Sequence, residues 1–453
     1  MRVKAQTLPI ACVVLAAGKG TRMRSKLPKV MHKIAHKPML MHVIDTALGL
    51  GAEKIVTVTS PDMDAVRKAV TVRYKSAAEN AIQHEQLGTG DAVKAAKSAL
   101  RNFDGAVFVL YGDVPLIRIE TLKKMADALK ADPKTAIVVL GMEAPLPNDY
   151  GRLVTGKDGT LERIVEVKDA SEKERQITLC NSGVMVVRGK MLFGLLAKLS
   201  AKNAQGEYYL TDIVAHARKD GQICRVVSAD SEELQGINSR IELAKGEESY
   251  QNRLRNEAMV AGVTMIDPKS VFLCGDTKLG QDVIIHPNVI FGPGVTVGDN
   301  VEIRSFSHLE GAKIAASAII GPFARLRPGA DIGKSAHIGN FVEIKQSVIE
   351  AGAKANHLSY IGDAHVGTNA NIGAGTITCN YDGYTKSRTT IGANAFIGSN
   401  TSLVAPVSVG EGAIVGAGSV ITEDVDTDAL AIARPQQKQK SQWAKSFRNR
   451  KKH

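Results

Sequence analysis

Residues 391–421 read IGANAFIGSNTSLVAPVSVGEGAIVGAGSVI, with a branched apolar residue at every sixth position. An α-helix favours a period of 3.6 and a β-strand a period of 2, so a period of six predicts a coil whose equivalent positions stack from turn to turn. Small and polar residues that suit sharp corners follow the apolar positions, as in Ile338-Gly339-Asn340. The pattern therefore predicts a solenoid of short parallel strands.

The same spacing extends over most of the C-terminal half of the chain. Eighteen in-phase positions are enough repeats for a stacked coil to be stable. The strict spacing lapses for longest between Ile344 and Ile391. The three runs are Leu279, Ile285, Phe291, Val297, Ile303, Leu309; Ile314, Ile320, Leu326, Ile332, Ile338, Ile344; and Ile391, Ile397, Leu403, Val409, Val415, Ile421.

Length and composition favour two domains. A chain of 453 residues suggests about three domains, but a solenoid forms one long domain, so two is the better count. Apolar residues make up 44% of the chain, which allows buried cores, and the aromatic share of 4% fits interiors built from Ile, Val, Leu and Ala.

The formal charge of +12 is concentrated at the C-terminus. Residues 434–453 hold eight Lys or Arg and no acid, which leaves about +4 over the preceding 433 residues. We therefore expect a solvated basic tail that could reach an anionic ligand, and no nucleic-acid partner.

The five cysteines form no C-x-x-C pair, so neither a zinc site nor a disulfide framework is expected, and a reducing cytoplasm fits. Arg2 and Lys4 before an apolar stretch imitate a signal peptide, but the stretch is interpreted as a buried first strand. No segment is long enough to cross a membrane. The cysteines are Cys12, Cys180, Cys224, Cys274 and Cys379.

The first 230 residues alternate between apolar strand-like runs and helical stretches. This order predicts an α/β domain with a mainly parallel sheet, in which ligands bind beyond the carboxyl ends of the strands. Helices are expected at Asp91–Leu100 and Ile119–Ala131. Strands are expected at Ile10–Leu15, Ile55–Thr59, Ala106–Leu110, Ala136–Leu140 and Val184–Val187.

The loop after the first strand runs from Leu15 to Met23 as LAAGKGTRM, and Leu27-Pro28-Lys29 follows. Two glycines let backbone N–H groups approach an anion, and Arg22 and Lys29 supply charge for a polyphosphate. The loop lacks both the P-loop pattern and the third glycine of a dinucleotide fingerprint. On its glycines alone, a tight strand-to-helix turn is an equally good interpretation.

The whole loop resembles the sugar-1-phosphate nucleotidyltransferases, whose hallmark is L-x-A-G-x-G-T-R-[LM] followed by P-K. Further matches follow in order at Gln83, at Gln86-Leu87-Gly88-Thr89 and at residues 111–116, YGDVPL. The resemblance implies that Asp113, at a strand end, and Asn238 are ligands of Mg²⁺, an ion that takes one or two carboxylates and keeps several waters.

Together, the transferase pattern and the solenoid resemble the family of bifunctional bacterial N-acetylglucosamine-1-phosphate uridyltransferases and glucosamine-1-phosphate N-acetyltransferases, from Ile10 to Arg434. That resemblance implies a Rossmann-like nucleotidyltransferase domain at 1–238, a helical linker at 239–263, a left-handed parallel β-helix of hexapeptide repeats at 264–433 and the tail at 434–453. The uridyltransferase site implied is Leu15, Ala16, Ala17, Gly18, Arg22, Lys29, Gln83, Gly88, Thr89, Tyr111, Gly112, Asp113, Gly151, Glu166, Asn181 and Asn238.

The second activity is expected where the ladder spacing lapses, because His357 lies there in a stretch that resembles the family's acetyltransferase loop. Acetyl transfer from a thioester to an amine needs a base, and His357 is the candidate. The N–H of Ala374 is the candidate oxyanion donor. The resemblance implies sugar-phosphate contacts from Arg327, Lys345, Tyr360 and Asn371, and acetyl-CoA contacts from Ala374, Asn380, Tyr381, Ser399, Ala417 and Arg434.

The resemblance thus implies a cytoplasmic homotrimer that acetylates glucosamine-1-phosphate with acetyl-CoA, then transfers uridylyl from UTP to N-acetylglucosamine-1-phosphate with Mg²⁺, in UDP-N-acetylglucosamine synthesis for the cell wall. Two alternatives stay open. In one, the solenoid is only structural or regulatory, which leaves the His357 segment unexplained. In the other, the chain is a scaffold with a degenerate transferase domain, which the intact Gly18, Lys29 and Asp113 disfavour.

Overall fold

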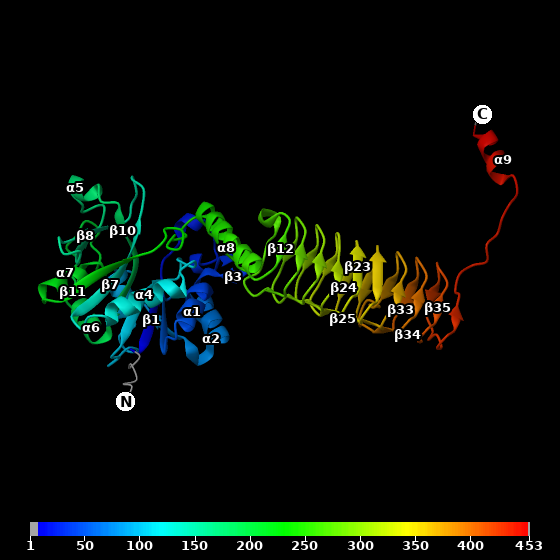
Figure 1. The fold of residues 1–453 in the computed structure, drawn as a ribbon, viewed down its shortest axis with the longest axis horizontal. Helices are drawn as coiled ribbons and strands as arrows, with labels where there is room; N and C mark the ends of the chain where they lie inside the picture. Colours follow the sequence, from blue (N-terminus) through cyan, green and yellow to red (C-terminus); the bar gives the residue numbers. More distant parts are fainter. Residues whose placement is uncertain (1–7, 452–453) are drawn as a thin grey trace. The chain divides into compact units, whose positions relative to one another are not determined.

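The computed structural model describes residues 8–451, so Arg2, Lys4 and the last two residues of the tail lie outside the described residues. The chain forms two compact units, Met1–Tyr250 and Gln251–His453. The first unit is an α/β domain and the second contains the solenoid (Figure 1).

The first unit is built on a mainly parallel sheet with the order β11-β7-β10-β6-β1-β4-β5, as predicted. The first strand is buried and pairs in parallel with both β4 and β6, whereas β10 runs antiparallel to β6 and β7. Its strands are β1 (Ile10–Leu15), β4 (Lys54–Thr59), β5 (Glu79–Ile82), β6 (Ala106–Tyr111), β7 (Thr135–Glu143), β8 (Arg152–Thr155), β9 (Leu161–Val165), β10 (Leu179–Arg188) and β11 (Ile223–Ser228).

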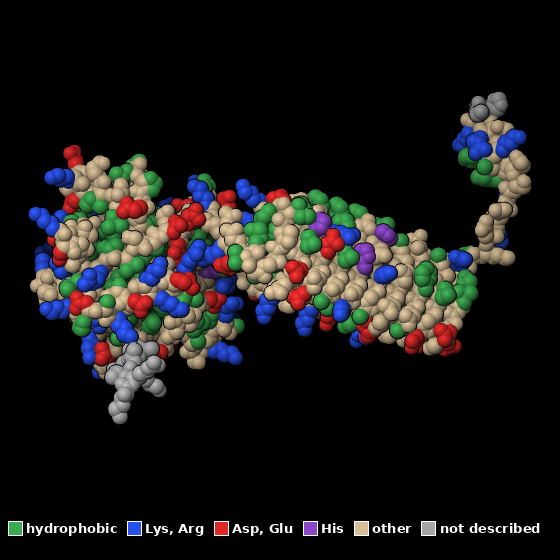
Figure 2. All heavy atoms as spheres, viewed as in Figure 1, with side chains coloured by type: hydrophobic (Ala, Val, Ile, Leu, Met, Phe, Trp, Pro, Cys, Tyr) green, Lys and Arg blue, Asp and Glu red, His purple; other side chains and the backbone are tan. Residues whose placement is uncertain are grey.

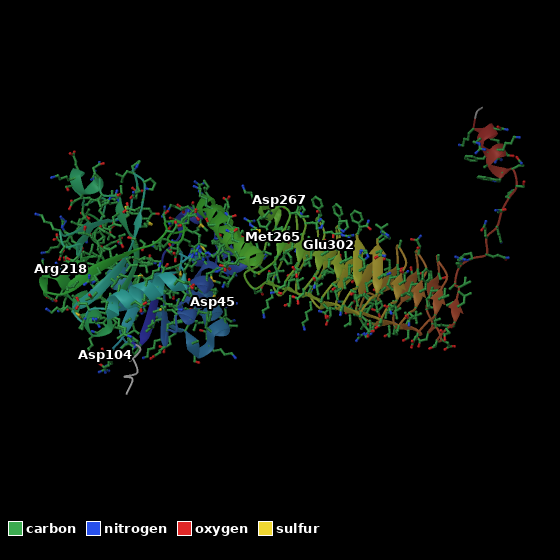
Figure 3. All side chains as sticks on the ribbon, in the orientation of Figure 1. Asp45, Asp104, Arg218, Met265, Asp267 and Glu302 are labelled. Atoms are coloured by element: carbon green, nitrogen blue, oxygen red, sulfur yellow. The ribbon has the colours of Figure 1, made fainter. Side chains whose placement is uncertain are left out.

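Helices cover both faces of this sheet, because successive residues of each strand point to opposite sides. Cys12 and Val14 face a core with α1, α2 and α4, and Ala11 and Val13 face a core with α3, α6 and α7. Asp45 of α1 (Figure 3) accepts a hydrogen bond of 2.7 Å from the Tyr74 hydroxyl of α2. The helices are α1 (Met39–Gly49), α2 (Asp64–Tyr74), α3 (Thr89–Lys94), α4 (Ile119–Lys130), α5 (Glu172–Arg175), α6 (Gly189–Leu196) and α7 (Asp212–Lys219).

The helix expected at Asp91–Leu100 is shorter than predicted. The α-helix ends at Lys94, and the chain continues in turns in which Ala96 N–H donates to the Val93 carbonyl and Lys97 N–H to the Lys94 carbonyl. These bonds span three residues instead of four, and the tighter geometry ends the regular helix while keeping Ala96 and Leu100 buried.

The solenoid consists of three parallel sheets, and each ladder residue pairs with its equivalent one coil later. All eighteen ladder residues except Leu279 are buried in one continuous core. This stack is consistent with the left-handed β-helix that was expected. The sheet that contains His357 is called the His357 sheet, and the sheet that contains Tyr360 is called the Tyr360 sheet.

The His357 sheet contains β12 (Thr264–Met265), β14 (Ile284–Ile285), β17 (Glu302–Ile303), β20 (Ile319–Ile320), β23 (His337–Asn340), β26 (Lys354–His357), β29 (Asn371–Ile372), β32 (Phe396–Ile397), β35 (Ile414–Val415) and β37 (Leu430–Ala431). The Tyr360 sheet contains β15 (Ile290–Phe291), β18 (His308–Leu309), β21 (Arg325–Leu326), β24 (Glu343–Lys345), β27 (Tyr360–Gly362), β30 (Ile377–Cys379), β33 (Ser402–Val404) and β36 (Val420–Ile421). The third contains β13 (Lys278–Leu279), β16 (Thr296–Val297), β19 (Lys313–Ile314), β22 (Ala330–Ile332), β25 (Ser347–Ile349), β28 (Ala364–Val366), β31 (Thr389–Ile391) and β34 (Val407–Val409).

The coil already includes Met265 (Figure 3), which pairs with Ile285 ahead of the first ladder run. One feature of the ladder differs from the prediction. The coil continues through the expected break, where Ile349, Ala355 and Ile361 take the ladder positions. The six-residue period is hidden because Ile349 follows Ile344 by only five residues, Ala355 is small, and a loop follows Cys379. None of these features interrupts the stack.

The expected linker contains α8 (Arg240–Val260), and the division between the two compact units falls inside this helix. The tail carries α9 (Trp443–Arg450), where Lys and Arg side chains gather (Figure 2). Between residues 8 and 451, no helix combines the length and the apolar character needed to cross a membrane.

Candidate active sites

A cavity of about 320 Å³ opens at the carboxyl ends of β1 and β6, where the α/β topology predicts a ligand. It brings together most of the uridyltransferase residues named from the sequence. Its lining includes Leu15, Ala16, Ala17, Gly18, Lys29, Gln83, Gly88, Thr89, Tyr111 and Asp113, together with Val30, Gln86, Ala92 and Glu207.

Two of the predicted residues, Asp113 and Asn238, contact a third, Lys29. Its Nζ lies 2.5 Å from Oδ2 of Asp113 and 2.9 Å from Oδ1 of Asn238, although the three residues are far apart in sequence. The N–H of Ile237 also donates to the Asp113 carbonyl at 2.9 Å, which fixes Asn238 beside the end of β6.

The same two oxygens fit a magnesium ion. One carboxylate and one amide oxygen already converge on a single cation, and Mg²⁺ uses few protein ligands because it keeps waters and takes phosphate oxygens. Among the residues of the structure that can be described, no group of three or more His, Cys, Asp or Glu forms a competing metal site. Asp113 and Asn238 are therefore a suitable donor pair.

The walls of the cavity are shaped by glycines and amides. A side chain at Gly88, where φ is +109°, would lie 2.8 Å from the Tyr208 carbonyl, so only glycine fits this turn. Gln83 donates to the Gly88 carbonyl at 3.1 Å, and Gln86 donates to the Ala17 carbonyl at 2.7 Å. The space beside Gly18 is open for 4 Å, which leaves backbone accessible to a ligand.

Gly151, Glu166 and Asn181 form a neighbouring cluster outside the cavity lining. A Cβ at Gly151 would lie 3.4 Å from Oε2 of Glu166, and Asn181 N–H donates to the Gly151 carbonyl at 2.8 Å. Burial raises the pKa of Glu166, even though the Thr211 hydroxyl donates to its Oε1 at 3.2 Å. Burial, followed by the charges of Asp113 and Glu166, raises the pKa of Tyr111, which places this phenol within electrostatic reach of both groups.

Besides the Gly151 cluster and Asn238, two more predicted residues, Arg22 and Gly112, are absent from the cavity lining. Arg22 is exposed and is absent from the lining. Gly112 N–H donates to the Leu15 carbonyl at 2.9 Å, so it connects β6 to β1 beside the site. Gln86 stands in a motif quoted from the sequence but was given no role, and neither its place in the wall nor that of Glu207 was predicted.

The register of the β-helix places three of the six predicted acetyl-CoA contacts on one edge together with His357. Ile338, Ala355, Ile372, Ile397 and Val415 are successive partners in the His357 sheet. The residues two positions after them therefore repeat at the same corner. They are Asn340, His357, Ala374, Ser399 and Ala417, and four of these five were predicted.

His357 is held by Asn340, which the sequence analysis did not assign to the site. Its Nδ1 lies 2.6 Å from Oδ1 of Asn340, a residue 17 positions earlier and in register with it. The amide oxygen can only accept, so Nδ1 carries the hydrogen and Nε2 keeps a lone pair. A spacing of 17, equal to one coil, is the sequence signal for this pair.

The predicted sugar-phosphate residues lie on adjoining strands. Arg327, Lys345 and Tyr360 belong to or follow strands of the Tyr360 sheet, and Asn371 lies on the His357 sheet. Arg327 pairs with Glu343 at 2.8 Å. The pKa of Lys345 is lowered, first by contact with Lys386 and its charge, so several cations gather here.

The loop after β30 carries two more predicted residues. Asn380 Nδ2 donates to Oδ2 of Asp363 at 2.5 Å, and the Tyr381 hydroxyl donates to the Gly383 carbonyl. Asp382 caps the loop by accepting from Thr385, and these hydrogen bonds lower its pKa to about 2. Arg434 donates to the Ala417 carbonyl.

Comparisons with known proteins find matches to both parts of the chain. The family model for the MobA-like NTP transferase domain matches residues 12–218, and that for the bacterial transferase hexapeptide (six repeats) matches residues 276–311 and 388–423. The bifunctional protein GlmU of Paramagnetospirillum magneticum is 56% identical over 439 residues, which cover 97% of this chain and 96% of that protein. The chain belongs to the GlmU family.

Other GlmU proteins support this assignment. That of Zymomonas mobilis is 51% identical, over 98% of both chains, and that of Sphingopyxis alaskensis is 52% identical, over 97% of this chain and 96% of its own. A solved UDP-glucose pyrophosphorylase complexed with UDP-glucose matches 54% of this chain and 100% of its own, at 18% identity and a TM-score of 0.44.

Membership of the GlmU family makes this chain a bifunctional enzyme with nucleotidyltransferase and acetyltransferase activities. The NTP transferase and hexapeptide matches correspond to the two activities, and its substrates are small molecules that include nucleotide sugars. The family also fits a role in cell-wall precursor synthesis.

Proposed function

We propose that the β-helix transfers acetyl from acetyl-CoA to glucosamine-1-phosphate, and that the α/β domain then joins N-acetylglucosamine-1-phosphate to the uridylyl group of UTP. The observation that carries this proposal is the contact between His357 and Asn340. It gives the corner shared with Ala374, Ser399 and Ala417 an oriented base, which a purely structural coil does not need.

In the acetyl step, the amine nitrogen of the sugar attacks the thioester carbonyl carbon. His357 Nε2 accepts the proton that the nitrogen loses, the C–N bond forms, and the C–S bond breaks to release CoA as the thiol after protonation. The Ala374 N–H donates no hydrogen bond among the described residues, so it is free to stabilise the oxyanion.

The ligands of this step divide between the two faces. Arg327 and Lys345 supply positive charge for the sugar phosphate, and Tyr360 and Asn371 supply hydrogen-bonding groups for its hydroxyls. Acetyl-CoA lies along the edge. Its proposed contacts are Ala374, Asn380, Tyr381, Ser399, Ala417 and Arg434.

In the uridylyl step, a phosphate oxygen of the sugar attacks the α-phosphorus of UTP, and the bond to the β-phosphate breaks to release pyrophosphate. Lys29 contacts the nucleotide phosphates, while Gln83, Gly88 and Thr89 border the nucleotide. Gly151, Glu166 and Asn181 bind the sugar. Mg²⁺, held by Asp113 and Asn238, would neutralise phosphate charge when bound.

We further propose that the enzyme acts as a cytoplasmic homotrimer, which the hexapeptide repeats and the free cysteines support. Residues 1–238 would form the uridyltransferase domain, 239–263 the connecting helix, 264–433 the acetyltransferase domain and 434–453 the tail. Sedimentation of the full chain tests the proposed trimer. A monomer at the concentration used for the activity assays would contradict it.

One assay tests both reactions. The full chain is mixed with glucosamine-1-phosphate, acetyl-CoA, UTP and Mg²⁺, and free CoA thiol and pyrophosphate are measured together. Both products are expected, and omission of acetyl-CoA should suppress both. Pyrophosphate from supplied N-acetylglucosamine-1-phosphate without any CoA release in the full mixture would support a purely structural β-helix instead.

A further inference from the structure

The first residue of α8 contacts two turns that position Lys29 in the wall of the uridyltransferase cavity. Lys29 lies in a 3₁₀ turn, Lys29–Met31, and its Cβ is so close to Gly20 that a Cβ there would lie 2.6 Å away. Gly20 begins a second turn, because its carbonyl accepts from the Met23 N–H at 3.0 Å. The position of Lys29 thus depends on both turns.

Arg240, the first residue of α8, contacts the end of each turn. Its Nε donates to the Met23 carbonyl at 3.3 Å, and its Nη1 donates to Nδ1 of His32 at 3.2 Å. His32 is 5% exposed, and burial, followed by the charge of Arg240, lowers its pKa. The imidazole is therefore neutral and can accept the guanidinium N–H.

Asn238 is fixed without Arg240. Oε2 of Glu242 accepts from the N–H groups of Asn238 at 2.7 Å and Ser239 at 2.8 Å, and Ile237 is bonded to the Asp113 carbonyl. These bonds hold the start of α8 beside the end of β6. Loss of the Arg240 side chain would therefore release the two turns that carry Lys29, and leave Asn238 in place.

We propose that Arg240 is a positioning residue for uridylyl transfer, which holds the Lys29 turn at the distance from Asn238 that UTP binding requires. The inference rests on the proposed function, because it assumes that Lys29 binds the phosphates of UTP. Arg240 acts through the Met23 and His32 ends of the turns and does not itself touch the reacting groups.

The test is steady-state kinetics of pyrophosphate release by the full-length Arg240→Ala enzyme. We expect the KM for UTP to rise about tenfold, which is the change that the loss of one interaction of moderate strength produces. The KM for N-acetylglucosamine-1-phosphate and the acetyl transfer rate should stay unchanged. Arg240→Lys should restore part of the loss, and Lys245→Ala, which removes an exposed cation of the same helix, is the matched control.

A double-mutant cycle shows whether the effect passes through His32. If the two residues act as one unit, His32→Leu combined with Arg240→Ala should raise the KM for UTP no further than the larger single change, whereas independent effects would multiply. His32→Asn, which keeps an acceptor near the Nδ1 position, should retain more UTP affinity than His32→Leu.

Direct binding separates a defect in ligand affinity from one in turnover. Calorimetric titration of the same variants with UTP in EDTA should show weaker binding for Arg240→Ala. If Arg240→Ala lowers the melting temperature but leaves the KM and the calorimetric affinity for UTP unchanged, Arg240 is only structural and the inference is wrong. If the wild-type enzyme releases no pyrophosphate, the proposed function fails first.

Discussion

His357 and Asn340 occupy equivalent places on consecutive coils, and Nδ1 of the histidine lies 2.6 Å from the amide oxygen of the asparagine. The stacking of coils brings together two residues that are 17 positions apart in sequence. The contact fixes the tautomer of the proposed base.

Asn340→Ala should slow acetyl transfer about tenfold or more, because the imidazole would lose the partner that keeps Nε2 unprotonated and oriented. Release of CoA thiol measures this, and uridylyl transfer by the same sample shows that the chain is folded. His365→Ala is the matched control, since His365 pairs instead with Glu350 at 2.8 Å. An unchanged acetyl transfer rate in Asn340→Ala would refute the role of the pair.

Metal removal should separate the two activities. With excess EDTA, pyrophosphate release should fall to background, while CoA release from glucosamine-1-phosphate continues, because Asp113 and Asn238 lie in the α/β domain. Asp113→Asn should reproduce the loss even with Mg²⁺ present. Equal inhibition of both reactions by EDTA would contradict this assignment.

Glu166→Gln should raise the stability of the fold and weaken uridylyl transfer. Burial raises the pKa of Glu166 in the folded chain, so its charged form destabilises the fold at neutral pH. The melting temperature of Glu166→Gln should therefore exceed that of wild type at pH 7, and the difference should vanish as pH falls below about 4.3, the value for unfolded chains. The KM for the sugar phosphate should rise. A variant less stable than wild type at pH 7 would show that burial is not the dominant effect.

Gly183→Ala should damage the uridyltransferase site through Tyr111. The new Cβ would lie 2.8 Å from the Tyr111 ring, at a φ of +90° that alanine rarely adopts. We expect a loss of about 1–3 kcal/mol in unfolding free energy and slower pyrophosphate release. Gly159→Ala, at a φ of +76° with open space around it, supplies similar backbone strain without the clash. Equal effects of the two variants would exclude the contact with Tyr111 as the cause.

Arg434→Ala should raise the KM for acetyl-CoA severalfold, because the Ala417 carbonyl holds Arg434 at the edge and the variant would lose the proposed contact with acetyl-CoA. Arg450→Ala, in the exposed α9, is the control. The KM for glucosamine-1-phosphate should not change in either variant. If the two arginine variants behave alike, Arg434 has no specific part in donor binding.

Much of the candidate site could be named from the sequence because its residues stand in compact motifs. The loop from Leu15 to Gly18 and the stretch ending at Asp113 each follow a strand, so their clustering in one cavity follows from the topology of a parallel sheet. The contributions of Gln86 and Glu207 could not be derived in this way, because a wall position depends on where a side chain points.

The sequence by itself determined the coil, because a repeat of six residues predicts a stack in which Ile303, Ile320 and Ile338 share a core. Only the tertiary structure decided that the coil continues from Ile344 to Ile391, that Asn340 holds His357, and that Arg240 reaches the turns around Lys29. The physical reason is that local spacing fixes which residues are buried, whereas contacts between distant residues depend on register and on how each chain segment packs in three dimensions.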